Sequence, residues 1–134
     1  MAKQFTFRGK TIEELNALSI EEFSKLVTSR ARRTLKRKDF KKFLKKIEKA
    51  RQAKAGGKDV KPVKTHRRDT IVVPAMVGLK VGIHAGKEFQ TVEITEKMLG
   101  HFLGEFALTR KRLLHGKAGI GATRSSTALV SARG

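Results

Sequence analysis

The sequence predicts an α+β fold in which a small antiparallel sheet of about three strands carries a packed helix. Apolar residues recur at helical spacing over residues 40–50, and they alternate with polar residues around a glycine turn over residues 79–94. Basic residues are concentrated outside that second region. We therefore expect basic N-terminal helices before the sheet, and after it a basic tail that is disordered on its own.

The N-terminal part begins with two capping boxes, in which a hydroxyl caps a helix and a Glu three residues later reaches back to the cap. Thr11 and Glu14 form the first box, which starts a short turn. Ser19 and Glu22 form the second, which predicts a longer helix that continues to Leu35. Cations at its end complement the helix dipole, but there are more of them than a dipole requires. They are Arg30, Arg32, Arg33, Lys36, Arg37 and Lys38.

A further amphipathic helix is predicted from an apolar repeat at positions i, i+3, i+4, i+7 and i+10. Only Asp39 and Glu48 are acidic within residues 36–51, whereas a merely solvated helix usually carries Glu–Lys pairs. The charge therefore favours a face that binds a polyanion. Residues 60–63 around Pro62 are expected to form a linker. The apolar positions are Phe40, Phe43, Leu44, Ile47 and Ala50.

The sheet is predicted from three segments. A continuously apolar strand is expected over residues 70–73, and half-buried strands over 79–84 and 89–94 form a hairpin around a Gly-containing turn. Thr95 is predicted to cap a helix that starts at Glu96. Gly100 and Gly104 would leave gaps on that helix, so that another backbone can approach it closely.

The charge distribution divides the chain. It has 31 Lys and Arg against 12 Asp and Glu, a net charge of +19. Residues 30–61 hold 15 basic and three acidic side chains. Residues 62–110 hold seven basic and five acidic ones, and residues 111–134 hold five basic and no acidic ones. We predict a helical basic extension at 1–61, an α+β core at 62–112 and a flexible tail at 113–134. The net charge indicates a polyanionic partner, with nucleic acid the first candidate and an anionic membrane surface the second.

Several classes of function are disfavoured. The chain has no cysteine, which excludes disulfides and thiolate metal sites. It shows no signal-peptide pattern and no run of about 18 apolar residues, so we expect a soluble, cytoplasmic protein. His101 and Glu105 are spaced to share a metal but are only two ligands, and no Ser/His/Asp set is evident. We therefore expect no enzyme, no metal, no cofactor and no small-molecule substrate.

The aromatic residues favour one kind of nucleic-acid binding. There are eight Phe and no Tyr or Trp, and the Phe residues mostly occupy apolar periodic positions that indicate core. Without exposed aromatic rings, recognition of the backbone and shape of a structured RNA is favoured over stacking on single strands. A basic DNA- or chromatin-binding module remains the alternative. A membrane-surface helix over 36–51 is disfavoured, because its apolar stripe is narrow and lacks Trp.

Two stretches resemble the S-nineteen family of small-subunit ribosomal proteins, "KTHRRDTIVVPAMVG" at residues 64–78 and "HAGKEFQTVEITEKMLGHFLGEFALTRK" at 84–111. The second has that family's Gly–Lys turn, a strand, and M-x-G-H-x-L-G-E-F-x-x-T, here Met98 to Thr109. The N-terminal extension and the tail "HGKAGIGATRSS" are similar to the archaeal and eukaryotic branch. Ala75 departs from the family, which usually has Glu there.

The resemblance implies a place in the head of the small subunit, bound to head-domain rRNA beside the S-thirteen family protein. It also implies a tail that reaches toward tRNA in the decoding region, with Lys117, Arg124 and Arg133 facing the tRNA. Residues 71–73 would seat a strand in the core and hold the basic residues before it against phosphates. The expected RNA-binding residues are Arg30, Arg32, Arg33, Arg37, Lys64, His66, Arg67, Arg68, Lys80, His84, Lys87, His101, Arg110, Lys111 and Arg112.

Overall fold

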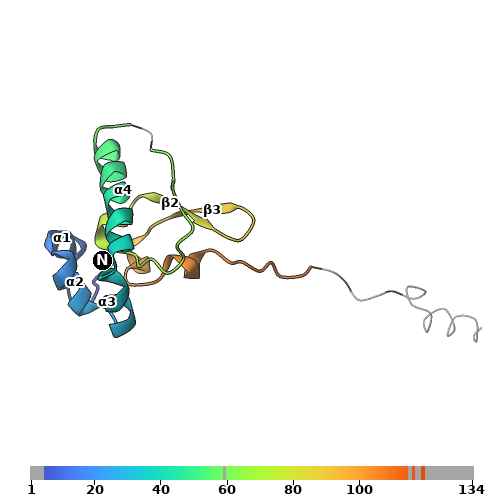
Figure 1. Cartoon of the computed structure of the whole chain (residues 1–134), viewed down its shortest axis with the longest axis horizontal. Coiled ribbons are helices and arrows are strands. Elements are labelled where there is room, and N and C mark those ends of the chain that lie inside the picture. Colours follow the sequence, from blue (N-terminus) through green and yellow to red (C-terminus); the bar gives the residue numbers. More distant parts are fainter. Residues whose placement is uncertain (1–4, 59, 115, 117–118, 120–134) are drawn as a thin grey trace, which may run out of the picture.

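The computed structural model describes residues 5–58, 60–114, 116 and 119, and within them it confirms the α+β prediction (Figure 1). The α-helices are α1 (Ile12–Ala17), α2 (Ile20–Leu26), α3 (Ser29–Leu35) and α4 (Lys38–Ala55). The strands are β1 (Val63–Thr65), β2 (Lys80–His84) and β3 (Phe89–Glu93). Three 3-10 turns are η1 (Pro74–Met76), η2 (Glu96–Met98) and η3 (Leu103–Phe106).

Both predicted capping boxes are present. The Thr11 backbone N–H donates to the Glu14 carboxylate at 3.0 Å, and Thr11 Oγ1 accepts from the Glu14 backbone. In the second box the Ser19 N–H donates to Glu22 Oε2 at 2.9 Å, and the Ser19 hydroxyl donates to the same oxygen. These bonds favour the ionised carboxylate and hold the pKa of Glu22 below its ordinary value, first through the Ser19 backbone and then through its hydroxyl. The two predicted helix starts, capped by Thr11 and Ser19, are therefore confirmed.

The prediction of one long helix from residue 20 to Leu35 is wrong, because this segment forms two helices, α2 and α3. Val27 and Thr28 are extended, with ψ of 166° and 158°, and they separate α2 from α3. Thr28 begins the second helix as its N-cap residue. The break turns the chain, and both Val27 and Ala31 remain buried. Helices α1, α2 and α3 form a small cluster around one end of α4 (Figure 1).

Helix α4 follows the predicted apolar repeat, and all five of its apolar positions are buried. The helix packs against η1, α3 and β1. Near its C-terminus the Lys54 ammonium donates to the carbonyl oxygen of Gly78, which joins the helix to the loop before β2. The opposite side of α4 is exposed and carries most of its lysines.

The sheet has the order β1-β2-β3, and the predicted hairpin of β2 and β3 is confirmed, with His84 opposite Phe89. The sheet is mixed and not antiparallel throughout as predicted, since β1 runs parallel to β2 with Val63 beside Val81. The first strand begins at Val63, the last residue of the expected linker. Residues 70–73, which were predicted to be a strand, are buried but form only one isolated bridge, from Ile71 to Phe102.

The α-helix predicted from Glu96 is also wrong, because the segment folds as η2 and η3. Thr95 makes no side-chain cap, and Gly100 has a φ of 78°, a left-handed conformation that ends the first turn. The backbone of residues 100–104 instead pairs with residues 68–72. One of these bonds runs from the Gly104 N–H to the Arg68 carbonyl at 2.9 Å.

One cluster of buried apolar side chains includes residues of α1 to α4 and of the sheet region. Phe23 and Ile47 from the helices, and Ile71 and Ile83 from the later segments, are among its members. The helices and the sheet therefore stabilise one another, while the predicted boundaries at 61/62 and 112/113 remain predictions. Most of the predicted tail, with Lys117, Arg124 and Arg133, lies outside the described residues.

Candidate nucleic-acid interface

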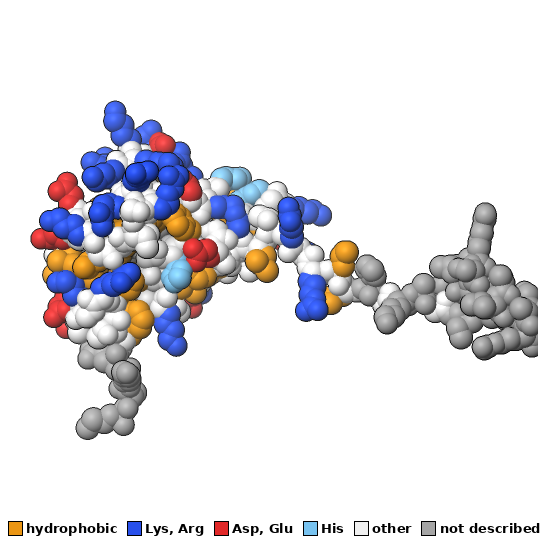
Figure 2. Space-filling model, turned by 90° about the horizontal axis from the view of Figure 1, so that it is seen from below, with side chains coloured by type: hydrophobic (Ala, Val, Ile, Leu, Met, Phe, Trp, Pro, Cys, Tyr) orange, Lys and Arg blue, Asp and Glu red, His pale blue; other side chains and the backbone are white. Residues whose placement is uncertain are grey.

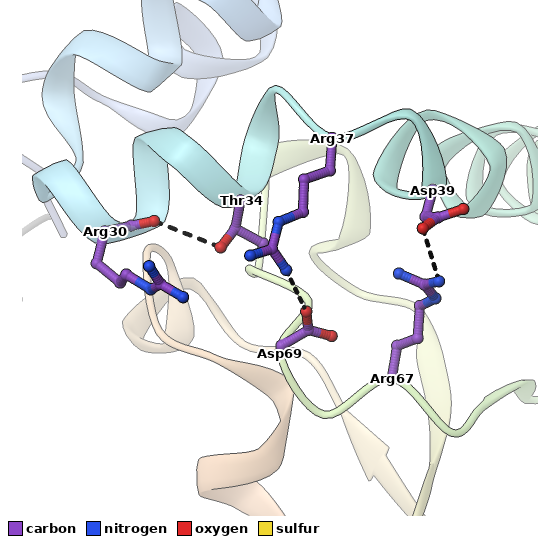
Figure 3. A network of polar contacts seen from close by, with 6 residues as sticks. All are labelled: Arg30, Thr34, Arg37, Asp39, Arg67 and Asp69. Atoms are coloured by element: carbon purple, nitrogen blue, oxygen red, sulfur yellow. Dashed lines mark hydrogen bonds and ion pairs between the residues drawn. The ribbon is translucent and has the colours of Figure 1, made fainter.

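Two ion pairs connect the α3–α4 junction to the loop after β1 (Figure 3). Arg37 contacts Asp69 at 3.2 Å, and Arg67 contacts Asp39 at 2.8 Å. The four side chains are about half exposed, between 47% and 50%. Each pair therefore contributes only about 0–1 kcal/mol to stability. In the candidate interface, these pairs mean that two of the arginines predicted to bind RNA already contact a carboxylate.

Arg68 turns inward and acts as a structural tie. Its guanidinium donates to the carbonyl oxygen of His84 at 2.8 Å and to that of Gly104 at 2.7 Å. It also donates to the carbonyl of Ala107. Hydrogen bonds from a charged donor are stronger than neutral ones. A phosphate contact by Arg68 stays a prediction, but its donors already link the end of β2 to the segment around η3.

Arg32 likewise donates hydrogen bonds to backbone carbonyls, at the end of α2. Its Nε donates to the Ser24 carbonyl at 3.0 Å, and its terminal nitrogen lies 3.3 Å from the Lys25 carbonyl and 3.4 Å from the Val27 carbonyl. The last carbonyls of a helix have no intrahelical partner, so an arginine that follows in the chain can satisfy them. The side chain stabilises the break between α2 and α3.

Other predicted RNA-binding cations point outward. Besides Lys64, whose ammonium lies over the Phe89 ring, six of them within residues 5–58 and 60–114 are exposed and form no ion pair with an acidic side chain. Lys111 lies 3.8 Å from Glu88 in a pair that is almost wholly exposed. These side chains can neutralise phosphates without breaking a contact of the fold. The six are Arg30, Arg33, Lys80, Lys87, Arg110 and Arg112.

The basic side of α4 belongs to the candidate interface, although its lysines were not among the predicted site residues. Lys42, Lys45, Lys46 and Lys49 are exposed at helical spacings of three and four, and we call them the α4 lysine face. Figure 2 shows Lys and Arg side chains crowded over one part of the surface with few carboxylates among them. The sequence signal was the scarcity of acidic residues over 36–51.

Two predicted histidines meet an aromatic ring outside the core. His66 and His84 have ring centroids 4.3 Å apart, and each lies 5.0 Å from the Phe89 ring, edge to face. We call these three residues the aromatic cluster. Phe89 is only half-buried, so it departs from the expectation that the Phe residues are core. Lys64 places its ammonium over the same ring, 5.3 Å from the centroid.

His101 and Glu105 do meet, as their spacing suggested, with Nδ1 and Oε2 2.7 Å apart. Both side chains are about half exposed. The described part of the chain holds no group of three or more possible metal ligands. Over the same residues, no helix combines the length and apolarity that crossing a membrane requires.

Comparison with known proteins agrees with this basic surface. A family model described as "Ribosomal protein S19" matches residues 31–115, a range that begins within α3. The chain is also similar to "Small ribosomal subunit protein uS19" from the archaeon Cenarchaeum symbiosum (strain A). The two are 47% identical over 129 residues, which cover 94% of this chain and 95% of the relative. The chain therefore belongs to the ribosomal protein S19 family.

Proposed function

We propose that the chain binds rRNA in the head of the small ribosomal subunit, with the α4 lysine face and the outward cations on the phosphates. A structural role in that subunit, with rRNA as a partner, follows from the family. The observation that carries the finer proposal is the division of the basic side chains. Some are held by carbonyls and carboxylates, whereas an exposed set has no acidic partner among the described residues.

The geometry of α4 suits a phosphate backbone. Residues 42 and 49 are seven positions apart, so the lysine face is about 10 Å long at the rise of an α-helix. Phosphates follow one another at a few ångströms along a nucleic-acid strand, so this length spans several of them. Neutralising them releases counterions, which makes such binding tight at low salt and weak at high salt. The mechanism is electrostatic docking of a preformed body, and the chain has no catalytic role.

The remaining parts of the proposal concern partners. The S-thirteen family protein is the proposed neighbour in the head, and the tail at 113–134 is proposed to reach toward tRNA. The sequence supports the tail's role, because residues 111–134 hold five basic and no acidic side chains and no apolar period. Such a segment buries too little surface to order alone, so it needs RNA or a partner already in place.

Sedimentation of the full chain and of a chain lacking residues 116–134 tests these proposals together. In lysates of cells that carry either form, both should migrate with small subunits in a sucrose gradient, because the core and α4 supply the rRNA contacts. Purified subunits with the shorter chain should bind tRNA several-fold more weakly.

A free or DNA-bound pool of the full chain would favour a DNA- or chromatin-binding module instead. Failure of only the shorter chain to enter subunits would place the tail in the rRNA anchor. Unchanged tRNA binding by the shorter form would remove the tail's proposed contact.

A further inference from the structure

The sheet has one covered face and one open face. Val81 and Ile83 of β2 point into the core and are fully buried. Residues that alternate with them lie on the other side, in the register Lys64 beside Gly82 and His84 beside Phe89. We call the second side the open sheet face. Its members are Lys64, Lys80, Gly82, His84, Phe89, Thr91 and Glu93.

Glycine at position 82 allows a lysine to cross this face. A Cβ on Gly82 would lie 3.2 Å from Lys64 Cγ, closer than most side-chain contacts. The aliphatic part of Lys64 therefore lies against the strand, and its ammonium reaches the Phe89 ring. The contact fixes a cation beside the aromatic cluster.

The rings of the cluster are held in place by backbone as well as by each other. The Gly86 N–H donates to His84 Nδ1 at 3.2 Å, which leaves Nε2 of the neutral ring as a donor. His66, directly after β1, is exposed and lies against His84 with an angle of 34° between the ring planes. One ring of the cluster therefore presents a surface to solvent while two neighbours orient it.

The surroundings of the cluster are basic. Phe89 also lines an open hollow of about 940 Å³ between the β2–β3 turn and residues 108–114. Lys87, Arg110 and Arg112 line the same hollow. Glu88 and Glu93 are the nearby carboxylates, and Glu93 stands opposite Lys80 in the sheet register.

We propose that the open sheet face binds an unpaired nucleotide of RNA, with its base stacked on His66 and its phosphates at Lys64 and the cations of the hollow. This inference rests on the proposed rRNA binding and adds a mode of contact that phosphate neutralisation lacks. A paired base in a helix hides its ring face, whereas an unpaired base can stack on aromatic or histidine rings. The positive surroundings match a phosphodiester chain.

The test uses the full chain and a transcript of the head domain of small-subunit rRNA, with dissociation constants measured over a range of salt. His66→Ala should weaken binding by about tenfold, because base–aromatic stacking contributes strongly to affinity. The slope of log affinity against log salt should not change, since no phosphate contact is lost. His66→Phe should restore the affinity, because it keeps a ring, and Phe89→Leu should weaken binding by removing the ring that supports His66.

Photo-cross-linking of the same transcript with 4-thiouridine locates the contact. The proposal expects cross-links in the peptides that hold His66 or Phe89. Wild-type affinity of both His66→Ala and Phe89→Leu, or cross-links confined to α4, would overturn the stacking proposal while leaving rRNA binding intact. If the unmodified chain fails to bind the transcript, the proposed function itself is overturned and the stacking proposal with it.

Discussion

Replacing Arg68 with Ala is expected to lower the free energy of unfolding by about 2–3 kcal/mol. The substitution removes three charge-assisted hydrogen bonds and leaves the carbonyls of His84, Gly104 and Ala107 without this partner. These carbonyls lie at the end of β2 and around η3, so the substitution removes the link that Arg68 makes between these two segments. Stability rather than RNA affinity should therefore respond first.

Urea unfolding of the full chain measures this effect, and the adjacent arginine supplies a matched control. Arg67→Ala removes a half-exposed ion pair with Asp39 and should cost at most about 1 kcal/mol. A similar loss in both variants, or a smaller one for Arg68→Ala, would show that the inward guanidinium contributes no more than a surface charge.

Replacing Gly104 with Val should destabilise the chain by at least about 2 kcal/mol, through the same contact. A Cβ on Gly104 would lie 2.9 Å from Arg68 Cβ and 3.1 Å from the Arg68 carbonyl oxygen, so the two backbones must separate. That separation breaks the Gly104 N–H bond to Arg68 as well as the guanidinium bonds. Reduced incorporation into small subunits should follow from the loss of folded protein.

Gly116→Val is the control, since a Cβ there would meet nothing within 4 Å. Thermal unfolding should show a lower midpoint for Gly104→Val only. The double variant Gly104→Val, Arg68→Ala should lose less free energy of unfolding than the sum of the two single variants' losses, because each substitution removes some of the same hydrogen bonds. Additive losses, or a Gly104→Val midpoint equal to that of the control, would contradict the close approach.

Local chemistry explains the parts of the fold that could be predicted. The capping boxes at Thr11 and Ser19 need only neighbours three residues away, and the apolar repeat of α4 needs only helical geometry. The β2–β3 hairpin is likewise local, because its two strands flank a short turn. In each case the interacting residues are close in sequence, so their pattern is visible there.

Long-range pairing explains the errors. Residues 63–65 became a strand because β2 lies beside them, whereas the more apolar residues 70–73 were covered by the chain at 100–104. The same pairing, together with the left-handed Gly100, prevented an α-helix after Glu96. No spacing within either segment shows which partner it will meet.

The candidate site shows the same limit. The charge pattern predicted a basic surface, and many of its cations are exposed, but the pattern alone made every arginine a candidate for phosphate contact. Arg68 finds carbonyls, and Arg37 and Arg67 find carboxylates, only after distant segments pack together. Arg32 finds the carbonyls of Ser24, Lys25 and Val27 because the chain breaks between α2 and α3. The aromatic cluster was missed for a similar reason, since His66 and Phe89 are 23 positions apart in sequence and meet across the sheet.

The salt dependence of rRNA affinity tests the division between structural and RNA-binding cations most directly. We compare the full chain with a variant in which Lys42, Lys45, Lys46 and Lys49 are all Gln, and with the double variant Arg37→Ala, Arg67→Ala, on the head-domain transcript. Each phosphate contact contributes about 0.7–0.9 to the slope of log affinity against log salt, so the lysine variant should flatten it by up to about 3. The arginine variant should keep the wild-type slope, because its two guanidinium groups face Asp69 and Asp39. An unchanged slope for the lysine variant, with a flattened slope for the arginine variant, would contradict the account.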